Sequence, residues 1–276
     1  MSRPIDKGRL PPPDQPRHVE VVHFSREPLA RQQQTRAVVG EVALAIEIVG
    51  GPVFTIMCSP GDERDLALGF LFAEGLIAGL DDVVEIDACV NGGRVSVKLA
   101  GEVPTGSRNL VINSSCGLCG REGLEALLAA LSPTDTALRI PLQVLFDVGA
   151  AVRERQQQFA VTGGCHAAAL FDARGGLRVV REDLGRHSAL DKAVGYTLRR
   201  RFPFAELGIF ISGRASAEML VKAARAGCPV LVAVSAASTA AIDVAQRLGI
   251  CLAGFARGDE LTVYTHPARI DLESKP

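Results

Sequence analysis

Hydrophobic and polar residues in the first third of the chain alternate in the way that strands require. Residues 38–49 and 53–57 are rich in β-branched and apolar side chains, and Gly50-Gly51 between them predicts a hairpin turn. Residues 83–89 and 94–99 form a second such pair around an Asn-Gly-Gly sequence. Between the hairpins, a serine cap, a proline and several acidic residues mark the start of a helix with a wide apolar face. The first half of the chain is therefore expected to be α+β.

Helical and strand patterns alternate beyond about Pro141. Helices are expected at residues 142–156, 187–201, 215–226 and 239–248, and strands at residues 165–171, 177–182, 207–211, 230–234, 250–255 and 261–264. Such alternation implies parallel strands covered by helices on both faces, with ligands at the carboxyl ends of the strands. We therefore predict an α/β fold. Its C-terminal domain has three layers, a hairpin followed by alternating helices and strands, and accompanies a smaller N-terminal α+β domain.

The first residues of the chain differ from the rest in composition. Six of the fifteen prolines lie within the first 31 residues, including Pro11-Pro12-Pro13. Proline-rich polar sequence stays extended or disordered, although a proline-motif ligand would have the same composition. We therefore expect a disordered tail over residues 1–18, an N-terminal domain over residues 19–135 and a C-terminal domain over residues 136–276.

Composition excludes several broad classes of protein. Hydrophobic residues make up 47% of the 276 residues and charged residues 22%, as is ordinary for a folded chain. The net charge of −1 and the 5% of aromatic residues argue against a general nucleic-acid binder, a membrane-surface binder or a base-stacking platform. The sequence contains no membrane-span pattern and no secretory-signal pattern. Seven cysteines do not suggest a disulfide framework, so we expect a cytoplasmic protein with reduced thiols.

The most distinctive local feature is a pair of cysteines, Cys116 and Cys119, each followed by glycine and both preceding a helical pattern. Two thiols at this spacing can act on one sulfur atom, because one attacks as a thiolate and the other resolves or reduces what forms. The positive end of the following helix favours the thiolate. A metal ligand, a redox dithiol and a sulfur carrier all fit the pair. Cys165-His166 would complete a metal site poorly, since adjacent strand residues point to opposite faces.

Glycine and arginine recur where strands of the second half give way to helices. The segments concerned are Gly185-Arg186-His187 and Ser212-Gly213-Arg214. Glycine lets backbone N–H groups approach an anion, a helix N-terminus attracts it, and arginine adds a fork of donors. A single turn of this kind fits a solvated arginine equally well. Several at one sheet edge favour an anionic ligand such as a nucleotide or a pterin phosphate.

The segment Phe255-Ala256-Arg257-Gly258-Asp259-Glu260 follows another predicted strand. A carboxylate beside a flexible glycine and an arginine could recognise the edge of a guanine base and hold its phosphate. An exposed polar hairpin turn has the same composition, since Gly-Asp favours turns. The residues alone leave both interpretations open.

Together, these motifs closely resemble the formate dehydrogenase accessory sulfurtransferase (FdhD) family. The motifs that carry the resemblance are, in order, Ser115-Cys116-Gly117-Leu118-Cys119-Gly120, Thr162-Gly163-Gly164-Cys165-His166, Glu182-Asp183-Leu184-Gly185-Arg186-His187, Ser212-Gly213-Arg214, Lys222-Ala223-Ala224-Arg225-Ala226-Gly227 and Gly254-Phe255-Ala256-Arg257-Gly258-Asp259. The resemblance implies a sulfur carrier that accepts sulfur from a cysteine desulfurase as a cysteine persulfide. It would pass the sulfur to the molybdenum cofactor, as bis(molybdopterin guanine dinucleotide), before the cofactor enters formate dehydrogenase.

The resemblance also assigns residues and partners. It places the persulfide on Cys116 with Cys119 as partner thiol, and the cofactor on residues 255–260, where Glu260 departs from the basic or neutral residue of relatives. The family resembles the cytidine deaminase fold, but this sequence lacks the zinc signature of deaminases, so we expect neither zinc nor deamination. The expected partners are a cysteine desulfurase, the catalytic subunit of formate dehydrogenase and the guanine nucleotide portion of the cofactor. A homodimer stays open.

Two other classes of function stay open at this point. A non-catalytic cofactor chaperone would bind the guanine dinucleotide and dock onto the dehydrogenase without carrying sulfur. A small zinc or iron–sulfur protein would bind metal through its cysteines.

Overall fold

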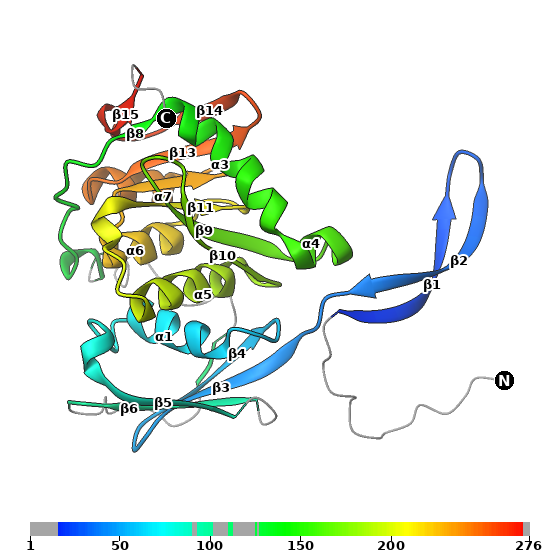
Figure 1. Cartoon of the computed structure of the whole chain (residues 1–276), viewed down its shortest axis with the longest axis horizontal. Coiled ribbons are helices and arrows are strands. Elements are labelled where there is room, and N and C mark those ends of the chain that lie inside the picture. The colour runs from blue at the N-terminus through cyan, green and yellow to red at the C-terminus, as the bar shows by residue number, and fades with distance from the viewer. Residues whose placement is uncertain (1–15, 90–92, 102–109, 113–124, 126, 273–276) are drawn as a thin grey trace.

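A computed structural model describes residues 16–272, apart from residues 90–92, 102–109, 113–124 and 126. Within these ranges the chain has a mixed α/β fold, as expected, in which two main sheets are separated and covered by helices (Figure 1). No helix in the described part of the chain is long and apolar enough to cross a membrane.

The N-terminal sheet has five described strands in the order β5-β6-β3-β4-β7. These strands are β3 (Val42–Ile48), β4 (Val53–Cys58), β5 (Val83–Cys89), β6 (Arg94–Leu99) and β7 (Leu110–Ile112). Antiparallel pairing of β3 with β4 and of β5 with β6 confirms both predicted hairpins. Parallel pairing of β3 with β6 and of β4 with β7 joins them into one sheet. Leu44, Ile46 and Ile48 are all buried, because alternate residues of β3 face the core.

An arm formed by β1 (Arg17–Ser25) and β2 (Ala30–Val38) extends away from the rest of the molecule (Figure 1). β1 begins at Arg17, inside the segment 1–18 that was expected to be a disordered tail, but the rest of the hairpin lies in the segment 19–135 that was expected to be folded. Val19 and Val21 alternate with polar residues, which favours a strand in spite of the nearby prolines. Residues 1–15, the rest of the expected tail, lie outside the described residues.

The C-terminal sheet has six described strands in the order β10-β9-β11-β12-β13-β14. They are β9 (His166–Asp172), β10 (Leu177–Asp183), β11 (Leu207–Ile211), β12 (Val230–Ala233), β13 (Cys251–Arg257) and β14 (Glu260–Val263). The predicted parallel arrangement holds for the neighbours β11, β12 and β13, and the antiparallel pairing of β9 with β10 confirms the hairpin that was predicted at the start of this domain. β9 runs antiparallel to both β10 and β11, and β14 runs antiparallel to β13. Tight turns fold β10 back onto β9 and β14 back onto β13, and β9 lies between β10 and β11, which α5 (Arg186–Arg199) connects in the chain.

Helices cover both faces of the C-terminal sheet. The helices are α3 (Leu142–Arg155), α4 (Gln157–Thr162), α5 (Arg186–Arg199), α6 (Ala217–Ala226) and α7 (Thr239–Arg247). Phe171 and Phe210 pack with α3 on one face, whereas Leu170 and Ile209 pack with α5, α6 and α7 on the other. The described part of this domain therefore has three layers, and its specific likeness to cytidine deaminases stays a prediction.

Helix α1 (Glu63–Ala73) joins the two halves by packing against α5, so that a single apolar core runs from the N-terminal sheet to α6 and α7. β8 (Ile140–Pro141) pairs with β15 (Ile270–Asp271) at the far end of the molecule. Short 3₁₀ turns are η1 (Leu80–Asp82), η3 (Phe204–Glu206) and η4 (Pro267–Arg269). The expected domain boundary between residues 135 and 136 stays a prediction.

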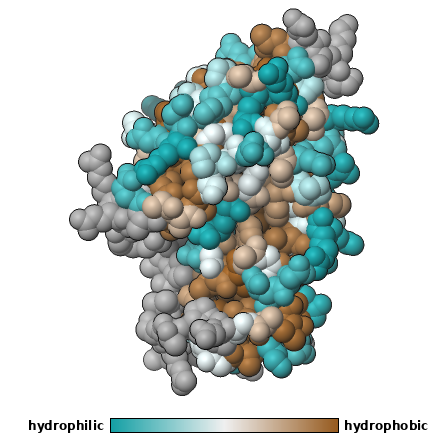
Figure 2. Space-filling model, turned by 90° about the vertical axis from the view of Figure 1, so that its left-hand side faces the viewer, coloured by the Kyte–Doolittle hydropathy of each residue, from teal (hydrophilic) through white to brown (hydrophobic). Residues whose placement is uncertain are grey.

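On one side of the molecule, the surface around the N-terminal sheet is more apolar than the surface around the C-terminal half. In Figure 2, hydrophobic residues gather in the lower half of the view, at the level of the N-terminal sheet. Met57 and Val84 of this sheet are 46% and 60% exposed. The N-terminal half thus contributes exposed apolar side chains, whereas the cavities described next belong mainly to the C-terminal half.

Candidate functional site

Strands β10, β11, β12 and β13 all end at the same edge of the C-terminal sheet. At this edge a cavity of about 580 Å³ lies between the ends of β11, β12 and β13 and the helices α3 and α4. We call this cavity the cradle. His166, the first residue of the antiparallel strand β9, also lines it.

The cradle brings together residues of two predicted segments that lie far apart in the sequence. Ser212 follows β11, and Ala256, Arg257 and Gly258 lie at the end of β13 and just beyond it. Carboxyl ends of neighbouring parallel strands share an edge, which is why these segments meet. Arg214 is exposed and does not line the cradle.

The described walls of the cradle carry positive charge and no carboxylate. Arg153 and Arg257 line it, and no aspartate or glutamate of the described residues does. The Nε atom of Arg257 donates to the carbonyl oxygen of Val234 at 3.0 Å, which fixes the side chain at the strand ends. Apolar surface comes from Phe146 and Phe210 among others. This combination suits a ligand with a flat, weakly polar ring and anionic groups.

His166 and Ser212 form the polar part of the cradle. Ser212 Oγ accepts the N–H of Ala167 at 2.9 Å and lies 3.4 Å from His166 Nδ1. Burial, together with the charges of Arg186 and His187, lowers the pKa of His166 below its ordinary value. The imidazole is therefore neutral at physiological pH, when it can both donate and accept a hydrogen bond.

Gly213 lies beside this polar group and beside Arg186. A Cβ atom at Gly213 would lie 3.5 Å from Arg186 Cδ and 3.6 Å from His166 Nδ1. Arg186 Nε is buried and has no hydrogen-bond partner among the described residues. Of the predicted site residues, Gly213 and Arg186 thus lie beside the cradle, although they are not part of its lining.

Gly185 and His187 lie instead where α5 meets the N-terminal half and α6. The N–H of Gly185 donates to Asp183 Oδ1 at 2.8 Å, and the other oxygen of Asp183 lies 2.8 Å from Lys192 Nζ in a buried ion pair. His187 is buried, and its Nδ1 lies 2.8 Å from Glu218 Oε1. These residues hold the helices together, and neither Gly185 nor His187 lines the cradle.

The predicted segment 255–260 divides between two cavities. Phe255, Asp259 and Glu260 line a separate cavity of about 410 Å³, which we call the Phe255 cavity, and Phe146 lies in the wall of both. Phe255 has a φ of 51° at an irregularity in the pairing of β13 with β14. Its ring is 47% exposed. A bulky residue held in the left-handed region with an exposed side chain is typical of a functional position.

Most thiols in the described part of the chain are unreactive. Burial raises the pKa of Cys165 and Cys251 to about 11 and that of Cys58 to about 12. Burial also raises the pKa of Cys228, whereas Cys89 is exposed. A thiol at such pKa values stays protonated and is a poor nucleophile.

The predicted cysteine pair, Cys116 and Cys119, lies outside the described residues. Within the described residues, no group of three or more histidine, cysteine, aspartate or glutamate side chains is arranged to hold a metal ion. Cys165 Sγ is directed toward Gln158 Oε1 at 3.5 Å, whereas the neighbouring His166 is directed toward Ser212.

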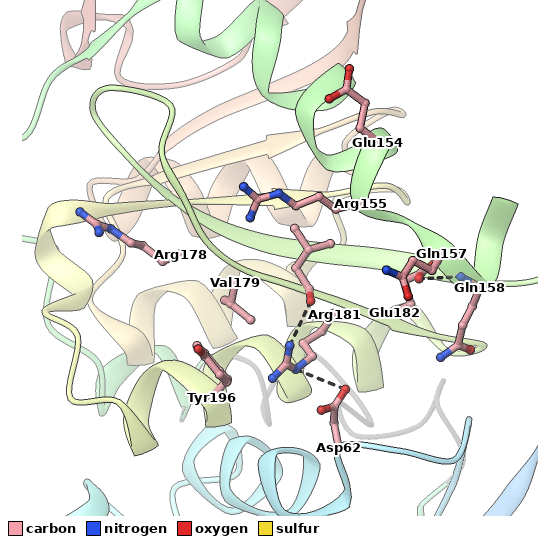
Figure 3. Close-up of a pocket in the computed structure, with 11 residues that line it drawn as sticks. Asp62, Glu154, Arg155, Gln157, Gln158, Arg178, Val179, Arg181, Glu182 and Tyr196 are labelled. Atoms are coloured by element: carbon pink, nitrogen blue, oxygen red, sulfur yellow. Dashed lines mark hydrogen bonds and ion pairs between the residues drawn. The ribbon is translucent and has the colours of Figure 1, made fainter. Parts of the chain in front are cut away.

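A third cavity, of about 520 Å³, follows the free edge of β10, and we call it the β10-edge cavity (Figure 3). Its described lining carries three arginines, Arg155, Arg178 and Arg181, and three carboxylates, Asp62, Glu154 and Glu182. Arg181 donates to the carbonyl oxygen of Val180 at 3.2 Å and lies 3.3 Å from Asp62, while Glu182 accepts the N–H of Gln158 at 2.9 Å. Because three carboxylates offset its three arginines, this cavity is a weaker candidate for an anionic ligand than the cradle, which no described carboxylate lines.

Sequence reasoning missed the residues that helices contribute to the cradle. Phe146 and Arg153 come from α3, and Phe159 comes from α4. A helix over residues 142–156 was predicted, but apolar periodicity identifies only the buried face of a helix. The sequence did contain one indication of such a residue, because Arg153 lies one turn before the start of α4 at Gln157.

The matched family model extends over residues 39–271, most of the chain, and describes the FdhD/NarQ family. This chain belongs to the FdhD/NarQ family. Two relatives, both named "Sulfur carrier protein FdhD", illustrate the similarity. The protein of Sulfolobus acidocaldarius is 42% identical over 79% of this chain and 84% of its own length. The protein of Mycobacterium tuberculosis is 39% identical over 92% of this chain and 98% of its own length.

A solved structure agrees with this FdhD/NarQ assignment at the level of the fold. It is described as a formate dehydrogenase accessory protein from Desulfotalea psychrophila and superposes with a TM-score of 0.77. The match covers 93% of this chain and 99% of the other, at 24% sequence identity. The resemblance to the FdhD family that the sequence motifs suggested is thereby confirmed.

Proposed function

We propose that this FdhD/NarQ protein is a sulfur carrier that transfers persulfide sulfur to a guanine-nucleotide form of the molybdenum cofactor, bis(molybdopterin guanine dinucleotide). The observation that carries the binding half of this proposal is the cradle, with Arg153, Arg257 and no described carboxylate. The names of the relatives support the sulfur-carrying half.

The two cavities match the two ends of a guanine nucleotide. Arg257 faces the cradle and would hold phosphate oxygens. Asp259 and Glu260 face the Phe255 cavity, where their carboxylates would accept the N–H groups on the edge of guanine while the Phe255 ring stacks on the base. Glu260, which would oppose a phosphate, is thus better placed beside the base.

Sulfur transfer would begin on Cys116. Its thiolate attacks the terminal sulfur of a persulfide on a cysteine desulfurase, a new S–S bond forms on Cys116, and the desulfurase cysteine leaves as a thiolate. Cys119 would then attack the Cys116 sulfur, which closes a disulfide and releases hydrosulfide to the cofactor. The two cysteines supply the two electrons that turn persulfide sulfur into sulfide, and a dithiol reductant reopens the disulfide.

The buried thiols of the described residues support the choice of this pair. Cys165 lines the cradle, but burial raises its pKa to about 11, so it would remain a thiol beside the bound cofactor. The cradle itself would therefore bind the cofactor without donating sulfur. A cytoplasmic location fits this role, because both donor and acceptor require reduced thiols.

The test is formate dehydrogenase activity in cells that rely on this chain for maturation of the enzyme. We expect the activity to be lost with Arg257→Gln and with the double variant Cys116→Ala, Cys119→Ala. Full activity with the double variant would favour the alternative, a cofactor chaperone that binds and docks without carrying sulfur. Full activity with Arg257→Gln would contradict the proposal that the cradle binds the cofactor.

A further inference from the structure

The elbow between α3 and α4 forms one wall of the cradle, outside every predicted site segment. Arg153 in the last turn of α3 lies with its guanidinium carbon 4.0 Å from the centre of the Phe159 ring on α4. Both side chains line the cradle. The guanidinium makes no hydrogen bond or ion pair with the described residues, so its N–H groups are available to a ligand.

Glu182 of β10 holds this elbow in place through hydrogen bonds to the backbone of α4. Its two carboxylate oxygens accept the N–H groups of Gln158 and Phe159 at 2.9 and 2.8 Å, at the start of α4, and Figure 3 shows the bond from Gln158. The hydrogen bond to Glu182 therefore fixes the backbone of Phe159. The ring in turn orients Arg153, because a guanidinium stacked on an aromatic face loses freedom before any ligand arrives.

We propose that Arg153 is a second phosphate-binding residue of the cradle and that Glu182 is its positioning residue. This inference rests on the proposed function, since it assigns a further contact to the same nucleotide. Arg257 at the strand ends and Arg153 at the elbow contact the anionic ligand from two different elements. A ligand with more than one phosphate fits this arrangement better than a single phosphate does.

The chain offers a matched control for Arg153. Arg155 lies two residues further along the same helix, is also exposed and makes no hydrogen bond or ion pair with the described residues. It lines the β10-edge cavity instead of the cradle (Figure 3). General attraction of an anion would involve both arginines equally, whereas specific contact involves only Arg153.

The experiment measures binding of guanosine diphosphate to the full chain by calorimetry at several salt concentrations. Arg153→Gln should weaken binding by about ten-fold and make it less dependent on salt. Arg153→Lys should restore part of the loss, and Arg155→Gln should stay within about two-fold of the parent protein. Glu182→Gln should weaken binding in the parent protein but not in the Arg153→Gln background, because Glu182 acts through Arg153.

The outcomes separate this inference from the proposed function. If the parent protein binds guanosine diphosphate and Arg153→Gln binds equally well, the inference fails while the proposed function stands. Equal losses in Arg153→Gln and Arg155→Gln would also overturn it. Additive losses for Arg153 and Glu182, in variants whose circular dichroism matches the parent protein, would remove Glu182 from the positioning role. If the parent protein does not bind the nucleotide, both the proposed function and this inference are overturned.

Discussion

Gly69 of α1 and Asp191 of α5 lie so close together that a Cβ atom on Gly69 would be 1.8 Å from the carbonyl oxygen of Asp191. The contact is reciprocal, since a Cβ atom on Gly195 would lie 1.8 Å from the carbonyl oxygen of Asp65. Two glycines thus let the helices cross backbone to backbone. This crossing connects the N-terminal half, which precedes Cys116 in the sequence, to the sheet that forms the cradle.

Gly69→Ala should therefore destabilise the whole protein. The added methyl group has no space, so the helices must separate, and we expect the free energy of unfolding to fall by about 3 kcal/mol or more. Urea denaturation followed by circular dichroism measures the loss. Gly79→Ala is the control: Gly79 has extended backbone with nothing within 4 Å of its Cβ position, so its effect should be below about 0.5 kcal/mol. Similar stabilities for the two variants would contradict the close crossing.

Lys192→Met should destabilise the protein in a pH-dependent way. Lys192 Nζ lies 2.8 Å from Asp183, and both side chains are buried. Burial raises the pKa of Asp183 and the charge of Lys192 offsets part of this rise, so removing the charge raises that pKa further. We expect a loss of about 3–5 kcal/mol near neutral pH, because an unpaired carboxylate stays buried.

The sign of the pH dependence distinguishes this mechanism from lost packing. A carboxyl group whose pKa is raised by folding favours the folded state when it is protonated, so the deficit of Lys192→Met should shrink as the pH falls from neutral toward the unfolded carboxyl pKa of about 3.9. Lys98→Met, at an exposed position, should change stability by less than about 0.5 kcal/mol. A deficit that is constant over this range would show that the charge of Asp183 is not its cause.

His166 should titrate below its ordinary pKa of 6.5, because burial, Arg186 and His187 disfavour its charged form while Asp183 opposes them only in part. Nuclear magnetic resonance of the imidazole, assigned by comparison with His166→Gln, gives the midpoint directly. A base whose pKa is lowered by folding stabilises the protein above the unfolded value, and that stability is lost as the pH falls. The parent protein should therefore lose more stability than His166→Gln below about pH 6.5. A midpoint at or above 6.5 would contradict the half-buried, neutral imidazole.

The parts of the fold that follow from local pattern were predictable from the sequence. The β3–β4 and β5–β6 hairpins and the positions of α3 and α5 follow from alternation, turn residues and apolar periodicity. The position of β9 between β10 and β11 was not predictable in this way, because strand order depends on long-range packing. The arm of β1 and β2 was also hard to predict, because a few valines favour a strand there while the nearby prolines disfavour one.

The candidate site was predictable where strand ends determine it. Ser212 and residues 256–258 meet because parallel neighbours end at one edge. The division of segment 255–260 between two cavities depends on the left-handed backbone at Phe255, which no pattern of side chains indicates. Arg153 was missed because its role arises from a helix packing over the sheet edge. His187 was expected at the ligand and lies against Glu218, since the first turn of α5 faces α6.

The measurement that tests the central claim most directly is the location of persulfide sulfur on this chain. The protein is incubated with a cysteine desulfurase and cysteine, and each cysteine is then examined by mass spectrometry of peptides. We predict that the added sulfur is on Cys116, disappears with Cys116→Ala and is unchanged with Cys165→Ala, whose thiol has a pKa raised to about 11. Persulfide that survives Cys116→Ala at the level of the parent protein would contradict the account.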